Sequence, residues 1–161
     1  MTIIGLSIAA FTKLHVLISL IGIASGLWFL FGLLGGRWRG GTNGLFLATT
    51  ILTTLTGFLF PITTLTPALI FGIISTAVLL VALVALYGFH LAGQWRTVYL
   101  ASALFALYLN LFVLVVQSFQ KIGALNRFAP TGTEPPFMVA QALTLLLFVY
   151  AAIRATRQRA L

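Results

Sequence analysis

The side chains of this sequence that are best suited to chemistry are two histidines, His15 and His90, and one carboxylate, Glu134. Glu134 is the only acidic residue, and there is no cysteine. General acid–base catalysis needs a second positioned group beside the first, and metal sites collect several His, Cys or carboxylate ligands. The sequence therefore predicts no catalytic residues and no metal site, and we expect that the protein is not an enzyme.

A haem held between His15 and His90 is the first cofactor to consider, because membrane helix bundles can hold haem between two histidines. The five-span topology described below places His15 near the outer end of the first helix and His90 near the inner end of the third. Their separation is then roughly 25–30 Å, most of the hydrocarbon thickness. Haem is therefore disfavoured, and it returns as a hypothesis only if residues 43–60 re-enter the membrane instead of spanning it.

Uncharged polar residues form a second pattern. Asn110 and Gln117 are seven residues apart, hence on one helix face, and Lys121 extends that face by another turn. A pocket in the outer half of the bundle would be lined by these side chains and by others at similar depth. The candidate ligand-binding residues are Asn110, Gln117, Lys121, Gln141, Glu134 and His15.

The structural interpretation of the same residues is that the amides bond between helices, each contributing about 0.6 kcal/mol, and we favour it. The inner half of the bundle is expected to be nearly pure aliphatic and aromatic. Glu134 is expected to start the last helix and to pair with a cation, and Lys13, Lys121 and Arg127 are on its side.

Composition indicates a membrane protein. Of the 161 residues, 61% are hydrophobic and 6% are charged, and the mean hydropathy is +1.15; soluble domains carry about 25% charged residues. The net charge of +8 could indicate nucleic-acid binding. The basic residues, however, lie at the ends of hydrophobic runs, where anionic headgroups favour them, so we expect the lipid bilayer and no nucleic acid as partner.

We predict a single all-α domain over residues 1–161, a polytopic transmembrane helix bundle. Its five predicted spans are residues 14–34, 43–60, 68–91, 98–119 and 137–153. The alternative is four spans plus a re-entrant segment, because residues 43–60 are short and rich in threonine. Residues 1–12 carry no basic residue, so a cleaved signal peptide is not expected, and these residues are expected to lie at the interface or to extend the first helix.

The basic residues orient the five spans. One side of the membrane would hold Arg37, Arg39, Arg96, Arg154, Arg157 and Arg159. The other side would hold Lys13, Lys121 and Arg127. The richer side is cytoplasmic by the positive-inside rule, so the N-terminus is periplasmic and the C-terminus is cytoplasmic. The aromatic residues predicted at the cytoplasmic interface are Trp38, Trp95, Tyr87, Tyr99 and Tyr150.

Small residues on the first span predict close helix packing. Gly22 and Gly26 form a GxxxG step, and such steps let two helix backbones approach in a membrane. We favour contacts within the monomer over a dedicated dimer face. The sequence shows neither an internal repeat nor an inverted pair of halves, which weakens a transporter hypothesis.

Several stretches resemble a family of small, uncharacterised multi-span membrane proteins of proteobacteria. They are residues 14–23 (LHVLISLIGI), 45–50 (LFLATT), 108–113 (YLNLFV) and 134–137 (EPPF). The resemblance implies a location in the bacterial inner (plasma) membrane and assigns no role to any residue.

Two functional hypotheses remain open. The first is a non-catalytic accessory or assembly subunit of a larger membrane complex, because acids, thiols, repeats and extramembrane domains are missing from the sequence. The alternative is a small-molecule binder that takes a quinone, a lipid or haem in the polar outer half. Neither identifies a particular partner, ligand or cofactor.

Overall fold

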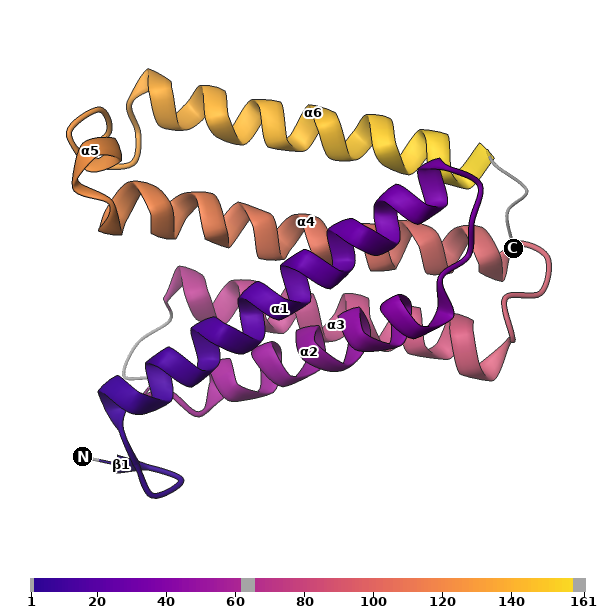
Figure 1. Ribbon diagram of the computed structural model, residues 1–161, viewed down its shortest axis with the longest axis horizontal. Coiled ribbons are helices and arrows are strands. Elements are labelled where there is room, and N and C mark those ends of the chain that lie inside the picture. The colour runs from indigo at the N-terminus through magenta and orange to yellow at the C-terminus, as the bar shows by residue number, and fades with distance from the viewer. Residues whose placement is uncertain (1, 62–65, 158–161) are drawn as a thin grey trace.

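The computed structural model describes residues 2–61 and 66–157 and is a bundle of helices with a small N-terminal hairpin (Figure 1). The hairpin pairs β1 (Thr2–Ile3) with β2 (Leu6–Ser7). The helices are α1 (Ile8–Leu34), α2 (Gly40–Phe58), α3 (Pro67–Leu83), the π-helical turn η1 (Val84–Gly88), α4 (Trp95–Lys121), α5 (Gly123–Asn126) and α6 (Pro135–Arg157).

Four helices are long and apolar enough to cross a membrane: α1, α3 together with η1, α4 and α6. They contain 22 to 27 residues, which at about 1.5 Å per residue gives a length of about 33–40 Å. The hydrocarbon core of a bilayer is about 30 Å thick. By length and composition, the chain is a multi-pass helical membrane protein.

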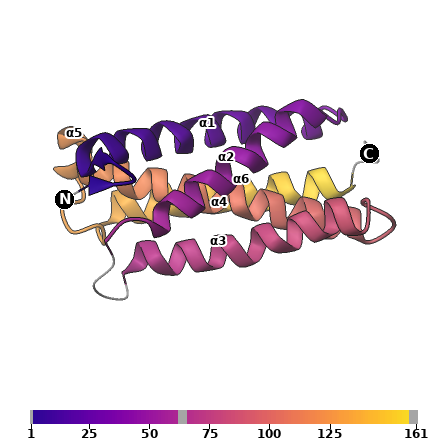
Figure 2. The same ribbon diagram turned by 90° about the horizontal axis from the view of Figure 1, so that it is seen from below.

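The successive helices α1, α2, α3, α4 and α6 alternate in direction along the bundle (Figure 1). Consequently α1 begins at one end of the bundle and α6 ends at the other. The central helix is α4, which packs against α1, α3 and α6, and Figure 2 shows α1 and α3 on opposite sides of it. The segment expected either to span or to re-enter is α2, one uninterrupted helix that packs along α1.

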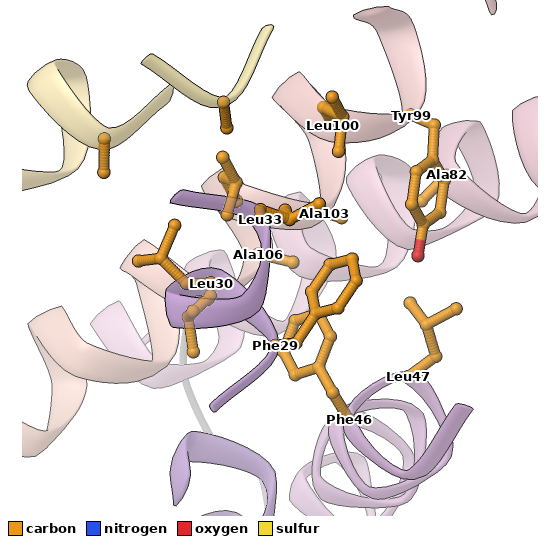
Figure 3. Close-up of a cluster of buried hydrophobic side chains, with 14 of the residues drawn as sticks. Phe29, Leu30, Leu33, Phe46, Leu47, Ala82, Tyr99, Leu100, Ala103 and Ala106 are labelled. Carbon is orange, nitrogen blue, oxygen red and sulfur yellow. The ribbon is translucent and has the colours of Figure 1, made fainter. Parts of the chain in front are cut away.

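The hydrophobic core lies where α1, α2, α3 and α4 meet (Figure 3). Phe29 of α1 and Phe46 of α2 are each 1% exposed and belong to the same buried cluster as Leu100 of α4. Ala103 and Ala106 of α4 belong to the same cluster. Their small side chains let α1 approach α4 closely.

The two glycines of the predicted GxxxG step bring α1 against its neighbours within the monomer, as expected. A Cβ atom at Gly26 would lie 2.5 Å from Cδ1 of Leu107 and 2.7 Å from Cδ2 of Phe46. A Cβ atom at Gly22 would lie 3.1 Å from Oγ1 of Thr49. A larger residue at either position would require these neighbouring side chains to shift, so the two glycines allow α1 to pack this closely on α2 and α4.

The helix boundaries agree with the predicted spans, with one clear difference. The first span was expected to begin at residue 14, but α1 begins at Ile8, and the hydroxyl of Ser7 caps it by accepting a hydrogen bond from the Ala10 N–H at 3.2 Å. Lys13 consequently lies within α1 and is exposed on its surface.

Candidate functional site

His15 bonds α1 to α2. Its Nδ1 lies 2.8 Å from the hydroxyl of Thr56, and this hydroxyl also lies 2.7 Å from the carbonyl oxygen of Leu52. The tautomer of the imidazole sets which of the two groups donates. When the hydroxyl donates to the Leu52 carbonyl, His15 donates from Nδ1, and the lone pair on Nε2 is then available to an external donor.

The second histidine lies far from the first. His90 follows η1 and is exposed, at the end of the bundle where α3 ends (Figure 1). His15 lies in the first part of α1, at the opposite end (Figure 1). The two imidazoles thus lie towards opposite ends of the bundle, and one iron cannot be ligated by both. Within the described residues, no three His or carboxylate side chains gather into a metal site.

Two of the predicted amides bond between helices. The Asn110 side-chain N–H donates to the hydroxyl of Thr50 at 3.3 Å and joins α4 to α2. The Gln141 side-chain N–H donates to the backbone carbonyl of Phe112 at 3.2 Å and joins α6 to α4. Both contacts are of the kind that fixes the register of a membrane bundle.

The same region contains two carbonyl oxygens without donors. Oε1 of Gln117 and Oε1 of Gln141 are both buried, and no described group donates a hydrogen bond to either. A buried acceptor that lacks a donor is costly, so such atoms are potential attachment points for a small molecule with an N–H or O–H group.

Glu134 organises the loop before α6. Its carboxylate accepts hydrogen bonds from the Thr131 N–H at 3.0 Å, from the Thr131 hydroxyl at 2.8 Å and from the Thr133 N–H at 3.0 Å. Desolvation raises the pKa of this carboxyl group, but the hydrogen bonds from Thr131 and Thr133 lower it by more, to about 2.

The sequence prediction for Glu134 is correct in one respect and wrong in the other. The last helix does begin beside it, at Pro135. The expected cationic partner was Lys13, Lys121 or Arg127, but the interactions of the carboxylate with described residues are those with the threonine hydroxyl and the backbone N–H groups. Short-range bonds to its own loop satisfy this carboxylate without an ion pair.

A small cavity of about 140 Å³ lies beneath that loop, between α4 and the start of α6. Its lining includes Phe119 and Gln120 of α4, Thr131 of the loop and Phe137 of α6. Lys121, one residue further along α4, is exposed. None of the six predicted ligand-binding residues is part of this lining.

The sequence analysis missed a buried polar pair in the half of the bundle expected to be aliphatic and aromatic. The Tyr99 hydroxyl of α4 donates a hydrogen bond to the side-chain oxygen of Asn43 of α2. Tyr99 is fully buried and Asn43 is 3% exposed. Trp38 packs edge-to-face against both Tyr99 and Phe29. Tyr99 was expected as an interfacial anchor and is instead a core residue, and Figure 3 shows its hydroxyl pointing towards α2.

No protein-family model, curated protein or solved structure matches this chain. The class of protein therefore follows from the fold and the composition: a small multi-pass helical membrane protein whose polar side chains bond mainly to their own bundle.

Proposed function

We propose that α2 is a fifth membrane span, so that the protein crosses a bacterial inner membrane five times with its N-terminus outside. The outward face of α2 supports this proposal. Leu45, Leu52, Leu55 and Leu59 are each 47–56% exposed and lie at helical spacing along one side. An outward stripe of leucines is what a lipid-facing helix requires.

The threonines of α2 are compatible with burial in a membrane. Their hydroxyls donate to carbonyl oxygens one turn earlier, in the pairs Thr49–Leu45, Thr53–Thr49, Thr54–Thr50 and Thr56–Leu52, at 2.7 to 3.0 Å. A hydroxyl that is bonded in this way is not left unsatisfied in hydrocarbon. Hydropathy scales assign each threonine a cost as if its hydroxyl were unbonded. The mean hydropathy of α2 therefore understates how well this helix suits the hydrocarbon region of a membrane.

Within the membrane, the protein acts as a non-catalytic accessory or assembly subunit that binds another membrane protein through α6. The observation that carries this proposal is the exposure of α6: of its 23 residues, only Ala151 and Ala155 are buried. Over the same helix, large apolar side chains are 45–66% exposed: Met138, Val139, Leu143, Leu145, Leu146, Leu147, Val149, Tyr150 and Ile153. Of the four long helices α6 is the least buried, with 6% of its apolar window buried against 22–44% in the other three, so it has the most surface available to a partner helix as well as to lipid.

The polar residues support a structural role over a catalytic one. His15, Asn110 and Gln141 each form a bond between two helices of the bundle. Such bonds fix helix register, which is what a rigid platform for a partner needs.

Site-specific photocrosslinking in native membranes tests the proposal. A photoreactive residue at Leu146 of α6 should give a discrete protein adduct. The matched control is Leu80 of α3, which is 57% exposed against 64% for Leu146, and it should give lipid adducts only. Lipid adducts from both positions would refute the accessory role.

The second candidate function, small-molecule binding in the outer half, is favoured by the buried oxygens of Gln117 and Gln141. A quinol hydroxyl or another small donor would satisfy them. Solvent extraction and an absorption spectrum of the purified protein test this candidate. A bound molecule that is lost in Gln117→Leu would support it, and an empty extract would refute it.

A further inference from the structure

An open groove runs between α1 and α2 in the half of the bundle next to the turn that connects them. Ile21, Ala24 and Trp28 line one wall, and Gly41 and Leu45 line the other. Its volume is about 600 Å³ and its lining is mostly apolar, and small-molecule sites usually measure about 300–1,000 Å³. The groove faces the surroundings of the bundle, where lipid chains lie in a membrane.

A cation lies against one of the residues that line this groove, Trp28. The Arg39 guanidinium carbon is 5.1 Å from the centre of the Trp28 ring. The arginine side chain reaches that position by crossing α1 at Gly32, where a Cβ atom would lie 2.8 Å from Cδ of Arg39. Its Nε is buried and receives no partner from the described residues. The guanidinium thus lies against Trp28, which lines the groove, and its terminal N–H groups are the ones that a ligand would meet.

The chain provides no acidic side chain for this cation. Glu134 is the only one in the sequence, and its loop lies at the opposite end of the bundle (Figure 1). A charged side chain at a membrane needs a counter-charge. The nearest source of negative charge in a membrane is the phosphate of an anionic lipid.

The start of α2 adds to the positive potential at the same end of the groove. Arg39 is the N-cap residue, and its side chain does not cap the helix. The first N–H groups of a helix carry partial positive charge and bind anions such as phosphate. Gly41 belongs to this first turn and lines the groove. A phosphate beside the turn could therefore meet Arg39 and the α2 terminus while an attached acyl chain lies in the groove.

We infer that the α1–α2 groove binds one anionic phospholipid, with an acyl chain between Trp28 and Leu45 and its phosphate at Arg39. This inference does not depend on the partner proposed for α6, because the residues that line the groove belong to α1 and α2. The leaflet concerned is the one that contains the turn between these two helices.

Native mass spectrometry of the full chain in detergent tests the site with two probes, phosphatidylglycerol and phosphatidylcholine with identical acyl chains. The wild type should retain one phosphatidylglycerol in preference to phosphatidylcholine. In Arg39→Gln, retention of phosphatidylglycerol should weaken about fivefold, the effect of one basic residue near a membrane surface, and the preference should disappear.

Two glycines of α2 provide a matched pair of variants. A Cβ atom at Gly41 or at Gly44 meets nothing within 4 Å, so neither Gly41→Leu nor Gly44→Leu should disturb the fold. Gly41 lines the groove, whereas Gly44 does not. Gly41→Leu should lose the phospholipid, and Gly44→Leu should retain it.

Three results would overturn the inference. Equal retention of the two lipids by the wild type would remove the role of charge. Equal retention by the two leucine variants would remove the role of the groove. A dimer of this chain that dissociates in Gly41→Leu would assign the groove to a second copy. Arg39→Gln need not fold for the outcome to be decided, because the pair at Gly41 and Gly44 is sufficient.

Discussion

The hydroxyl of Tyr99 donates a hydrogen bond to the side-chain oxygen of Asn43, a residue 56 positions earlier in the chain. Both side chains are buried in the core. The bond joins residues near the starts of α2 and α4. Trp38, which lies on the turn between α1 and α2, packs its ring against Tyr99. A polar contact thus fixes how the α1–α2 hairpin sits on the central helix.

Replacement of Tyr99 by phenylalanine should lower the free energy of unfolding by about 1–3 kcal/mol, because Asn43 would then lack its donor in a buried site. Thermal or denaturant unfolding in detergent measures this loss. Tyr87→Phe is the control, since the Tyr87 side chain is 66% exposed, and it should unfold like the wild type. Equal stability of the two variants would contradict a structural role for the buried bond.

Gly26 should not tolerate a methyl group. A Cβ atom there would overlap Leu107 and Phe46, each 1% exposed and therefore closely surrounded. Gly26→Ala should destabilise the bundle by about 1–3 kcal/mol, although alanine is the better helix former.

Gly44→Ala is the control for this packing effect, because open space surrounds that position. The substitution should leave stability unchanged or raise it by up to about 1 kcal/mol. Unfolding midpoints of the two variants decide the matter, and similar midpoints would show that α1 can move away from α4 without cost.

The helices could be located from the sequence because hydrophobic runs, glycine stops and prolines mark them clearly. The structure places a helix over each of the five predicted spans. The sequence left open whether the residues before the first span extend its helix, because Ser7, a good helix cap, lies within an apolar stretch that gives no other boundary signal; the structure begins α1 at Ile8. Which side of α2 faces α1 could not be predicted, since a threonine-rich helix has two plausible faces until its neighbours are known.

The tautomer of His15 gives a spectroscopic prediction. We expect the Thr56 hydroxyl to donate to the Leu52 carbonyl and to accept from Nδ1, so the ¹⁵N chemical shifts at pH 8 should show a protonated Nδ1 and an unprotonated Nε2. In Thr56→Val that preference should disappear, and stability should fall by about 0.6 kcal/mol, the mean for a hydrogen bond between membrane helices.

Thr54→Val is the matched control, because the Thr54 hydroxyl bonds only to the carbonyl of Thr50 in its own helix among the described contacts. The His15 shifts should not change in that variant. An Nε2-protonated His15 in the wild type would reverse the donor and acceptor assigned to this pair.

Glu134 should make loop stability depend on acid pH. The bonds from Thr131 and Thr133 lower the pKa of the folded carboxyl to about 2, from an ordinary value of 4.5. Because the folded pKa is depressed, the ionised carboxylate stabilises the loop fully above the pKa of the unfolded chain. This stabilisation is lost as the pH falls from 4.5 towards 2. Hydrogen exchange of the Thr131 and Thr133 amides should accelerate, relative to intrinsic rates, across that window.

The same experiment on Glu134→Gln supplies the comparison. The glutamine is neutral at every pH, so its amide exchange, again relative to intrinsic rates, should show no transition between pH 4.5 and 2. A wild-type loop that is indifferent to this pH range would mean that the carboxylate is not what orders it.

The candidate site was less predictable than the helices. Residue type and depth identified His15, Asn110 and Gln141 as polar groups within the bundle. Their partners, Thr56, Thr50 and the Phe112 carbonyl, depend on helix rotation, which periodicity alone does not fix. Tyr99 was expected at the interface because tyrosine is enriched there, and Asn43 was not singled out; only the tertiary structure shows the two together in the core.

The topology can be decided with single cysteines, because the native sequence contains none. If α2 spans the membrane, Arg37→Cys and Gln94→Cys should react only with a thiol reagent supplied to the cytoplasmic side. Thr66→Cys and Arg127→Cys should react only from the periplasmic side. Thr66 is the informative position, since it follows α2 and precedes α3. If α2 instead re-entered, Thr66→Cys would label from the same side as Arg37→Cys, and the five-span proposal would be refuted.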